Sequence, residues 1–333
     1  MPEIRKDIVS GSWVIIATER AKRPETFTLE RTKKIDKIEN CPFCYGGEHT
    51  TPAEVLAIRN NTSAPDEPGW DVRVIPNKFP ALSFNENQQW EKQGLFEFMG
   101  AKGVHEVIIE TPDHNNSPGK LPVEHVKKII DSYYHRFLEL EKNNDVKYIQ
   151  IFRNHGKEAG ASIEHPHSQL MALPVLPPSI KQEMEEARKY YFQEKRCVYC
   201  NIIEEELERK DRIITENQDF IAFIPYAARL PFETWIIPKR HQSSFSEITM
   251  GERQSLADIL QEVLSRLWEY LNDPPYNYYL HTSPTGYKEI PDYHWHFEVV
   301  PKLTTSAGFE LGAGMFINIS NPEASAEFMR KGH

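Results

Sequence analysis

Cys41-Pro-Phe-Cys44 and Cys197-Val-Tyr-Cys200 together hold all four cysteines of the chain. After each pair come a single histidine and then a His-x-His segment, in the same order. The histidines that follow the first pair are His114, His165 and His167, and those that follow the second are His241, His294 and His296. Two metal-ligand sets in one order indicate a duplicated domain. The boundaries that we predict are 1–178 for an N-terminal catalytic domain and 179–333 for a degenerate C-terminal domain.

The bulk properties of the chain are those of a globular protein with two domains of ordinary size. The net charge of −10 argues against a broad nucleic-acid surface. There is no apolar run of the ~20 residues that a membrane helix needs, and residues 1–7 lack the apolar core of a signal peptide. We therefore expect a cytoplasmic protein with no membrane partner, in which the thiols stay reduced.

Apolar residues at a spacing of three to four predict long amphipathic helices over 121–141 and 252–271, and a charged helix over 179–194 links the halves. Short β-rich runs surround each long helix, for example 105–110, 148–152 and 296–300. Short strands with a single long helix in each half predict an α+β fold with a mostly antiparallel sheet. The acidic run 204–208 is interpreted as the solvated face of a helix.

The cysteines and histidines form two candidate zinc sites, since zinc prefers four thiolate and imidazole ligands in tetrahedral geometry. In the first site, His114 and His165 complete the Cys41/Cys44 pair. In the second site, His241 and His294 are the candidates that complete the Cys197/Cys200 pair. His281 and His296 compete for the fourth position there, and Glu183 is a candidate for a separate site with oxygen ligands. Buried thiols or a dithiol redox pair are the alternatives.

The segment 154–169 carries the residues best suited to catalysis. In a strand, His165, His167 and Gln169 share one face. A neutral imidazole is a competent nucleophile near pH 7, so His167 is the candidate nucleophile beside a metal-held His165. Gln169 and Ser162 are candidate donors to a phosphoryl oxygen. The glycines of the preceding loop allow backbone N–H groups to approach an anion. The alternative is two strand histidines beside a buried glutamine.

At these residues the chain resembles the galactose-1-phosphate uridylyltransferase family of the histidine-triad superfamily. The shared motifs are 20–24 (Arg-x-x-Arg-Pro), the Cys41/Cys44 knuckle, 112–114 (Pro-Asp-His) and 165–169 (His-Pro-His-x-Gln). The resemblance implies two tandem histidine-triad-like domains. It also implies that His167 attacks the α-phosphorus of a nucleotide-sugar, releases a sugar 1-phosphate and passes the nucleotide to a second phosphate acceptor.

The same resemblance implies roles for further residues. Gln169 and Ser162 would contact the transferred phosphoryl group. The dimer of the family implies that the C-terminal tail of one subunit completes the site of the other. The predicted substrate-binding residues are Arg20, Arg23, Asn77, Asn154, Gly156, Ser168, Phe309 and Glu310. The C-terminal half would be a degenerate copy that supports structure, with His296 spare.

Ser168 stands where the uridylyltransferase motif usually has glycine. The His-x-His-Ser-Gln form, the second Cys-x-x-Cys and the tail 308–318 resemble the ADP-glucose phosphorylase branch of the family. The expected function is nucleotidyl transfer of the UDP-glucose–hexose-1-phosphate type. The alternatives are an ADP-glucose phosphorylase that uses inorganic phosphate, a nucleotide hydrolase, and a zinc-stabilised nucleotide-binding module without turnover.

Overall fold

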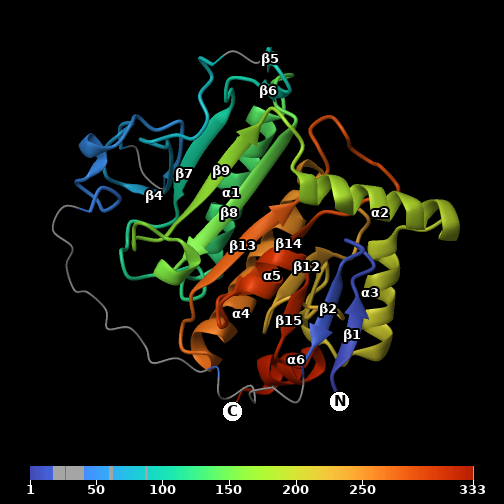
Figure 1. The fold of residues 1–333 in the computed structure, drawn as a ribbon. Helices are drawn as coiled ribbons and strands as arrows, with labels where there is room; N and C mark the ends of the chain where they lie inside the picture. The colour runs from blue at the N-terminus through green and yellow to red at the C-terminus, as the bar shows by residue number, and fades with distance from the viewer. Residues whose placement is uncertain (18–26, 28–40, 60–62, 87–88, 333) are drawn as a thin grey trace.

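The computed structural model describes the chain except residues 18–26, 28–40, 60–62, 87–88 and 333 (Figure 1). Its centre is a ten-stranded sheet in the order β10-β11-β12-β14-β13-β8-β9-β7-β4-β3. Every neighbouring pair in this sheet is antiparallel. The predicted α+β class with a mostly antiparallel sheet is confirmed. The five strands of each half form one half of the sheet, and β13 and β8 join the halves edge to edge.

The strands of the N-terminal half of this sheet are short, as the sequence predicts. They are β3 (Leu56–Arg59), β4 (Trp70–Pro76), β7 (Val104–Ile109), β8 (Tyr148–His155) and β9 (His167–Leu173). Those of the C-terminal half are β10 (Ile213–Glu216), β11 (Phe220–Phe223), β12 (Thr234–Pro238), β13 (Tyr276–His281) and β14 (His296–Pro301).

Two smaller sheets complete the β structure of the described residues. One joins β1 (Glu3–Lys6), β2 (Trp13–Ile16) and β15 (Phe316–Asn318), so that the two ends of the described chain meet. The other is the hairpin of β5 (Glu91–Gln93) and β6 (Phe96–Phe98), which projects from one end of the molecule (Figure 1).

The helices are α1 (Val123–Leu140), α2 (Pro178–Glu194), α3 (Val198–Arg209), α4 (Met250–Tyr270), α5 (Gly308–Ala313) and α6 (Pro322–Lys331). The first, second and fourth of these match the helices predicted at 121–141, 179–194 and 252–271. The start of α4 is fixed by a capping box, in which Thr249 accepts from the N–H of Glu252 and Glu252 accepts from that of Thr249. No described helix combines the length and apolar character needed to cross a bilayer.

The main core lies between one face of the large sheet and helices α1 and α4. Val126, Ile130 and Phe137 of α1 are buried in the same core cluster as Leu170 and Ala172 of β9. Burying each large apolar side chain in this way contributes roughly 1.5–3 kcal/mol before entropic costs. Because side chains alternate along a strand, His167 and Gln169 point to the opposite face of the sheet. The packing of α1 therefore fixes which face of β9 presents His167 and Gln169.

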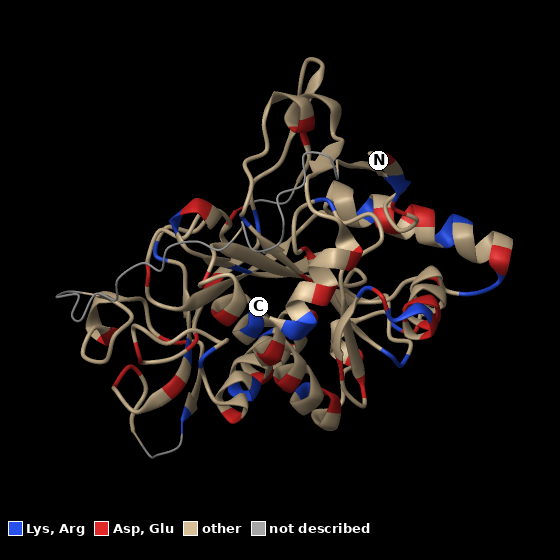
Figure 2. Ribbon diagram, turned by 90° about the horizontal axis from the view of Figure 1, so that it is seen from below, with Lys and Arg blue, Asp and Glu red and all other residues tan. Residues whose placement is uncertain are grey.

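Acidic and basic positions both occur throughout the ribbon. In the view of Figure 2, acidic and basic residues alternate along the helices rather than gathering by sign.

Candidate active site

The first Cys-x-x-Cys pair lies on a tight turn in front of strand β4. A Cβ on Gly47 would lie 2.8 Å from the carbonyl oxygen of Cys41, so a larger residue cannot occupy this position without moving the backbone. The neighbouring Gly46 has φ +90°, in the region that favours glycine. The two glycines therefore allow the chain to fold back and bring both thiols to one side.

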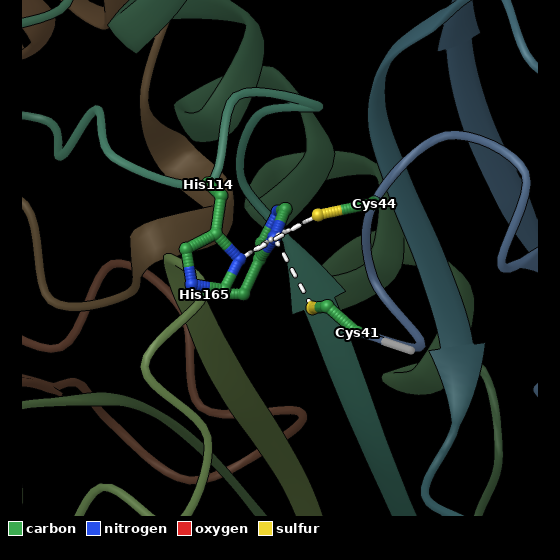
Figure 3. Close-up of side chains that lie close together, drawn as sticks. All are labelled: Cys41, Cys44, His114 and His165. Atoms are coloured by element: carbon green, nitrogen blue, oxygen red, sulfur yellow. Dashed lines mark hydrogen bonds between the residues drawn. The ribbon is translucent and has the colours of Figure 1, made fainter. Parts of the chain in front are cut away.

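The thiols of Cys41 and Cys44 converge with the imidazoles of His114 and His165 (Figure 3). All four candidate ligand atoms lie within 4.8 Å of one another. The Cys44 Sγ–Nδ1 distance is 3.5 Å to each histidine, and the two Nδ1 atoms are 3.2 Å apart. A tetrahedral ion of zinc's size separates sulfur from nitrogen ligands by about 3.6 Å and two nitrogens by about 3.3 Å. The four residues therefore fit a metal ion.

The outer nitrogen of His165 is also fixed. Its Nε2 lies 2.7 Å from the carbonyl oxygen of Thr111 and so donates to it, which leaves Nδ1 without a proton and free to bind metal. Burial lowers the pKa of His165 to about 4, so the ring is neutral at pH 7. A neutral imidazole with a fixed orientation is the form that binds metal.

His167 begins strand β9 two residues after His165, and only 6% of it is exposed. Its Nδ1 lies 2.8 Å from the carbonyl oxygen of His165, to which it donates, so Nε2 carries the lone pair. Burial lowers the pKa of His167 to about 4. The ring of Phe43, from inside the Cys-x-x-Cys turn, lies 5.5 Å from the His167 ring. The metal-site turn thus contacts the candidate nucleophile directly.

Gln169 is oriented by a histidine that the sequence analysis did not select. His105 Nδ1 accepts from the backbone N–H of Ala81, so its Nε2–H donates to Gln169 Oε1 at 2.7 Å. This leaves the amide N–H groups of Gln169 as donors. The side-chain nitrogen of Asn77 lies 3.2 Å from the same Nε2. The sequence feature that could have identified His105 is its polar side chain at the start of the strand, two residues before the apolar run 107–109.

A buried ion pair lies on the α1 face of the sheet, opposite to the face that carries His167. Arg153 and Glu110 are both fully buried and form a close salt bridge. Arg153 Nη1 also approaches the carbonyl oxygen of His167 at 3.5 Å. Removing one partner of such a pair typically costs about 3–5 kcal/mol, because the other charge remains buried. The pair was not predicted from the sequence, because its members are 43 residues apart without a motif.

The other predicted site residues divide into two groups. Asn154 alternates onto the same face of the sheet as His167, where its Oδ1 accepts from Asn277 at 2.8 Å. Gly156 has φ +81°, and a Cβ there would lie 3.0 Å from Pro275, so the loop requires glycine. Ser162 is exposed on this loop.

Ser168 is not on the His167 side. It is fully buried on the α1 face, where Tyr133 donates to its hydroxyl at 2.7 Å. Phe309 is nearly half exposed on α5, and Glu310 accepts from the N–H of Ala307. Neither shares a hydrogen bond with His167 in the described part of the chain. Arg20 and Arg23 lie outside the described residues.

The second Cys-x-x-Cys pair repeats the arrangement of the first. The candidate ligand atoms of Cys197, Cys200, His241 and His294 also lie within 4.8 Å of one another. Cys200 Sγ is 3.4 Å from His241 Nδ1 and 3.8 Å from His294 Nδ1. His241 Nε2 donates to the carbonyl oxygen of Ile290 at 3.0 Å. This group can therefore hold a metal ion in the same way.

His281 and His296 are not members of the second group. They gather instead with Glu183, and all three are buried. His281 Nδ1 lies 3.0 Å from Glu183 Oε1. His294 therefore takes the fourth position beside Cys197, Cys200 and His241, for which His281 and His296 were the competing candidates. Glu183 lies with His281 and His296 in a separate group that offers both oxygen and nitrogen ligands.

Comparison with known proteins places both halves of the chain in one family. Residues 1–177 match the N-terminal domain of galactose-1-phosphate uridyl transferase, and residues 183–315 match its C-terminal domain. The chain is 37% identical to Arabidopsis thaliana ADP-glucose phosphorylase, over 99% of this chain and 93% of that protein. It is 31% identical to Thermotoga maritima galactose-1-phosphate uridylyltransferase, over 99% of this chain and 98% of that protein.

Solved structures agree with this assignment. A crystal structure of Arabidopsis thaliana ADP-glucose phosphorylase with bound ADP-glucose superposes with a TM-score of 0.85 at 35% identity, and covers 100% of this chain and 99% of that one. A uridylyltransferase structure superposes with a TM-score of 0.77 at 31% identity, over 99% of this chain and 97% of that one. The chain therefore belongs to the galactose-1-phosphate uridyl transferase family, a family of nucleotidyltransferases.

Proposed function

We propose that this protein transfers a nucleoside monophosphate from a nucleotide-sugar to a phosphate-bearing acceptor through a nucleotidyl-histidine at His167. The observation that carries the proposal is the state of the His167 ring. Its Nδ1–H donates to the His165 carbonyl, so the lone pair is on Nε2. A neutral, oriented imidazole of this kind is a competent nucleophile.

In the first step, His167 Nε2 forms a bond to the α-phosphorus of the nucleotide-sugar. The bond from that phosphorus to the bridging oxygen breaks, and the sugar 1-phosphate leaves with that oxygen. In the second step, an oxygen of the acceptor phosphate attacks the same phosphorus and His167 is regenerated. The Gln169 amide donates to the phosphoryl oxygens that gain charge. Ser162, Asn154, Gly156 and Asn77 bind the substrate on the same side.

ADP-glucose is the nucleotide-sugar that we favour, with inorganic phosphate as the acceptor. The support is the 37% identity with an ADP-glucose phosphorylase over nearly the whole chain, against 31% with a galactose-1-phosphate uridylyltransferase. UDP-glucose with a hexose 1-phosphate is the second candidate. The support for this second substrate pair is that both halves of the chain match the galactose-1-phosphate uridyl transferase family.

Both Cys₂His₂ groups are proposed to bind Zn²⁺ in a structural role. The thiolate and imidazole ligands and their spacing support this ion. A bound ion in the first group would hold His165 and, through its carbonyl, the ring of His167. Elemental analysis of the purified protein should find about two zinc ions per chain. Less than one zinc per chain, in protein purified without chelator, would contradict the proposal.

Intact mass spectrometry under non-acidic conditions tests the transfer most directly. The protein is mixed separately with ADP-glucose and UDP-glucose, and a variant with His167→Asn serves as the control. An adenylyl adduct on the wild-type chain alone would support the favoured substrate, and a uridylyl adduct would support the second. Phosphate should then remove an adenylyl adduct and yield ADP. AMP released without phosphate would instead identify a hydrolase, and an inert wild-type chain would favour the binding module.

We also propose that the protein is a cytoplasmic homodimer in which Phe309 and Glu310 of one subunit contact the substrate of the other. The support is the exposure of Phe309 and of the neighbouring Leu311 on α5. Sedimentation equilibrium at micromolar concentration should give twice the mass of the chain. A monomer that has full transferase activity would overturn this part of the proposal.

A further inference from the structure

The glycine loop at the end of β8, residues 154–162, lies against the C-terminal half of the chain. Strand β8 pairs with β13 at the junction of the two halves, in a register that sets Asn277 opposite Asn154. Residues 273–277 therefore run alongside the loop and contact it at three points. None of these five residues was a candidate in the sequence analysis.

Two of the three contacts fix the start of the loop. His155 Nε2 lies 2.9 Å from Asp273 Oδ1 and donates to it. The tautomer follows from the other ring nitrogen, since Nδ1 lies 3.4 Å from the guanidinium of Arg153, which can only donate. Pro275 makes the second contact, because it packs so close to Gly156 that a Cβ there would lie 3.0 Å from it. A carboxylate and a proline ring thus hold the backbone where the loop begins.

Asn277 makes the third contact with a single side-chain amide. Its Nδ2 donates to the backbone carbonyl of Ala159 and to Asn154 Oδ1, both at 2.8 Å. A carbonyl oxygen can only accept, so Asn277 must present its nitrogen to Ala159. The same nitrogen then requires an acceptor from Asn154. The orientation of the Asn154 amide is therefore set by a residue of the other half.

This orientation leaves Nδ2 of Asn154 as a donor. The atom lies beside the loop, since a Cβ on Gly160 would be 3.6 Å from it. Asn154 is on the same face of the sheet as His167, so the donor is presented on the side of the candidate nucleophile. Ala159 ends the short turn 157–159, and its carbonyl ties that turn to β13. One amide thus controls both a side chain and the backbone of the loop.

We propose that Asn277 is a positioning residue for nucleotidyl transfer, which turns the Asn154 amide toward the transferred phosphate and holds the glycine loop in place. The inference rests on the proposed transfer at His167. Asn277 acts through Asn154 and Ala159 rather than on the phosphate itself. The C-terminal half then serves the reaction through the segment 273–277, and not through its own His-x-His strand.

A double-mutant cycle of Asn277→Ala and Asn154→Ala tests this role. The rate to measure is single-turnover adduct formation with ADP-glucose, or with UDP-glucose if only that substrate forms the adduct. Asn277→Ala should lower this rate about 10–100-fold, because a displaced donor no longer matches the transition state. In the Asn154→Ala background the same change should lower it less than about threefold, since the residue through which Asn277 acts is already gone. Equal factors in the two backgrounds would indicate a merely structural role and overturn the proposal.

Thr285→Val is the matched control for a lost hydrogen bond between the halves. The Thr285 hydroxyl donates to the carbonyl of Val146 at 2.6 Å, just before the opposite end of β8. This variant should form the adduct within about twofold of the wild-type rate. A loss as large as that of Asn277→Ala would mean that any contact between the halves has the same effect, and would overturn the specific role of Asn277.

Amide hydrogen exchange of the segment 154–162 separates this inference from the proposed function, because it needs no turnover. The loop amides should exchange at least about fivefold faster in Asn277→Ala than in Thr285→Val. Unchanged exchange would overturn the inference even in an active enzyme. Faster exchange in a protein whose wild-type chain forms no adduct would retain Asn277 as the anchor of the loop and reject the transfer. Asn277→Ser, whose single hydroxyl cannot donate to both acceptors, takes the place of Asn277→Ala if that variant fails to fold.

Discussion

Strands β9 and β14 occupy equivalent places in the two halves of the sheet, and each begins at the second histidine of a His-x-His segment. In both halves, the ring inside the Cys-x-x-Cys turn packs on that histidine. Phe43 lies 5.5 Å from His167, and Tyr199 lies 5.3 Å from His296. The two copies therefore share a scaffold, and the difference between them lies in a few side chains.

The first difference is access. His167 is 6% exposed, whereas His296 is completely buried and is enclosed by the rings of Tyr199, Trp235 and His281. Its Nε2 is one of the buried nitrogens without a hydrogen-bond partner. That nitrogen also lies 3.6 Å from Glu298 Oε1, so a carboxylate and packed rings surround it. His296 is therefore less accessible than His167, and we propose that the C-terminal scaffold serves packing rather than transfer.

The second difference is charge. Two residues after His167 the strand has Gln169, a neutral donor, but two residues after His296 it has Glu298. The pKa of the Glu298 carboxyl is well below its usual range. Burial alone would raise this pKa, but the positive charge of Arg229 and the neighbouring histidines have the larger effect. An ionised carboxylate beside the histidine repels a phosphate. We therefore propose that the exchange of one amide for one carboxylate separates a site that accepts a phosphoryl group from one that excludes it.

The strongest test of this comparison replaces the two histidines in turn. His167→Asn should lower nucleotidyl transfer by at least about 10⁴-fold, because it removes the nucleophile of the proposed covalent intermediate. His296→Asn should keep transfer within about tenfold of wild type. Initial rates with ADP-glucose and phosphate measure both. Comparable losses in two folded variants would mean that both strands are catalytic and that the comparison is wrong.

A second test moves the C-terminal arrangement into the N-terminal site. Gln169→Glu should lower kcat by roughly 10²–10³-fold, because it replaces a donor to the phosphoryl group with a negative charge. Gln169→Ala is the control for loss of the donor without added charge, and it should be less damaging. Single-turnover rates of adduct formation separate this effect from substrate binding. Equal rates for the two variants would show that charge is not what distinguishes the strands.

A third test compares the two metal groups. Cys41→Ser and Cys197→Ser should each lose about one metal ion per chain, as measured by elemental analysis. The Cys41 variant should also lose about 10–100-fold in activity, because His165 positions His167 through its carbonyl. The folded Cys197 variant should keep most of its activity. An unaffected Cys41 variant that has lost its metal would show that the ion does not position the nucleophile.

Patterns along the chain were sufficient to predict much of this molecule. The amphipathic spacing located α1 and α4, because a helix that covers a sheet must present one apolar face. The repeated Cys-x-x-Cys and histidines identified both Cys₂His₂ groups, because ligand identity is carried by residue type. His105 and the Arg153–Glu110 pair were not found, since strand pairing brings together residues without a shared motif. The separation of His281 and His296 from the second Cys₂His₂ group likewise depends on three-dimensional placement.

Ser168 shows the limit of motif reasoning most clearly, and it provides the last and smallest test. It lies within the His-x-His-Ser-Gln motif, yet alternation along β9 turns it toward α1 and the Tyr133 hydroxyl. Ser168→Ala should therefore lower the free energy of unfolding by about 1 kcal/mol, through one lost hydrogen bond, and change turnover by less than about twofold. Urea denaturation and initial rates measure the two quantities. Ser162→Ala, on the exposed loop, is the matched control and should show the reverse, with unchanged stability and turnover lowered about tenfold. A Ser168 variant with wild-type stability and tenfold lower turnover would place its hydroxyl at the substrate after all, and the face of β9 that carries the chemistry would have to be reassigned.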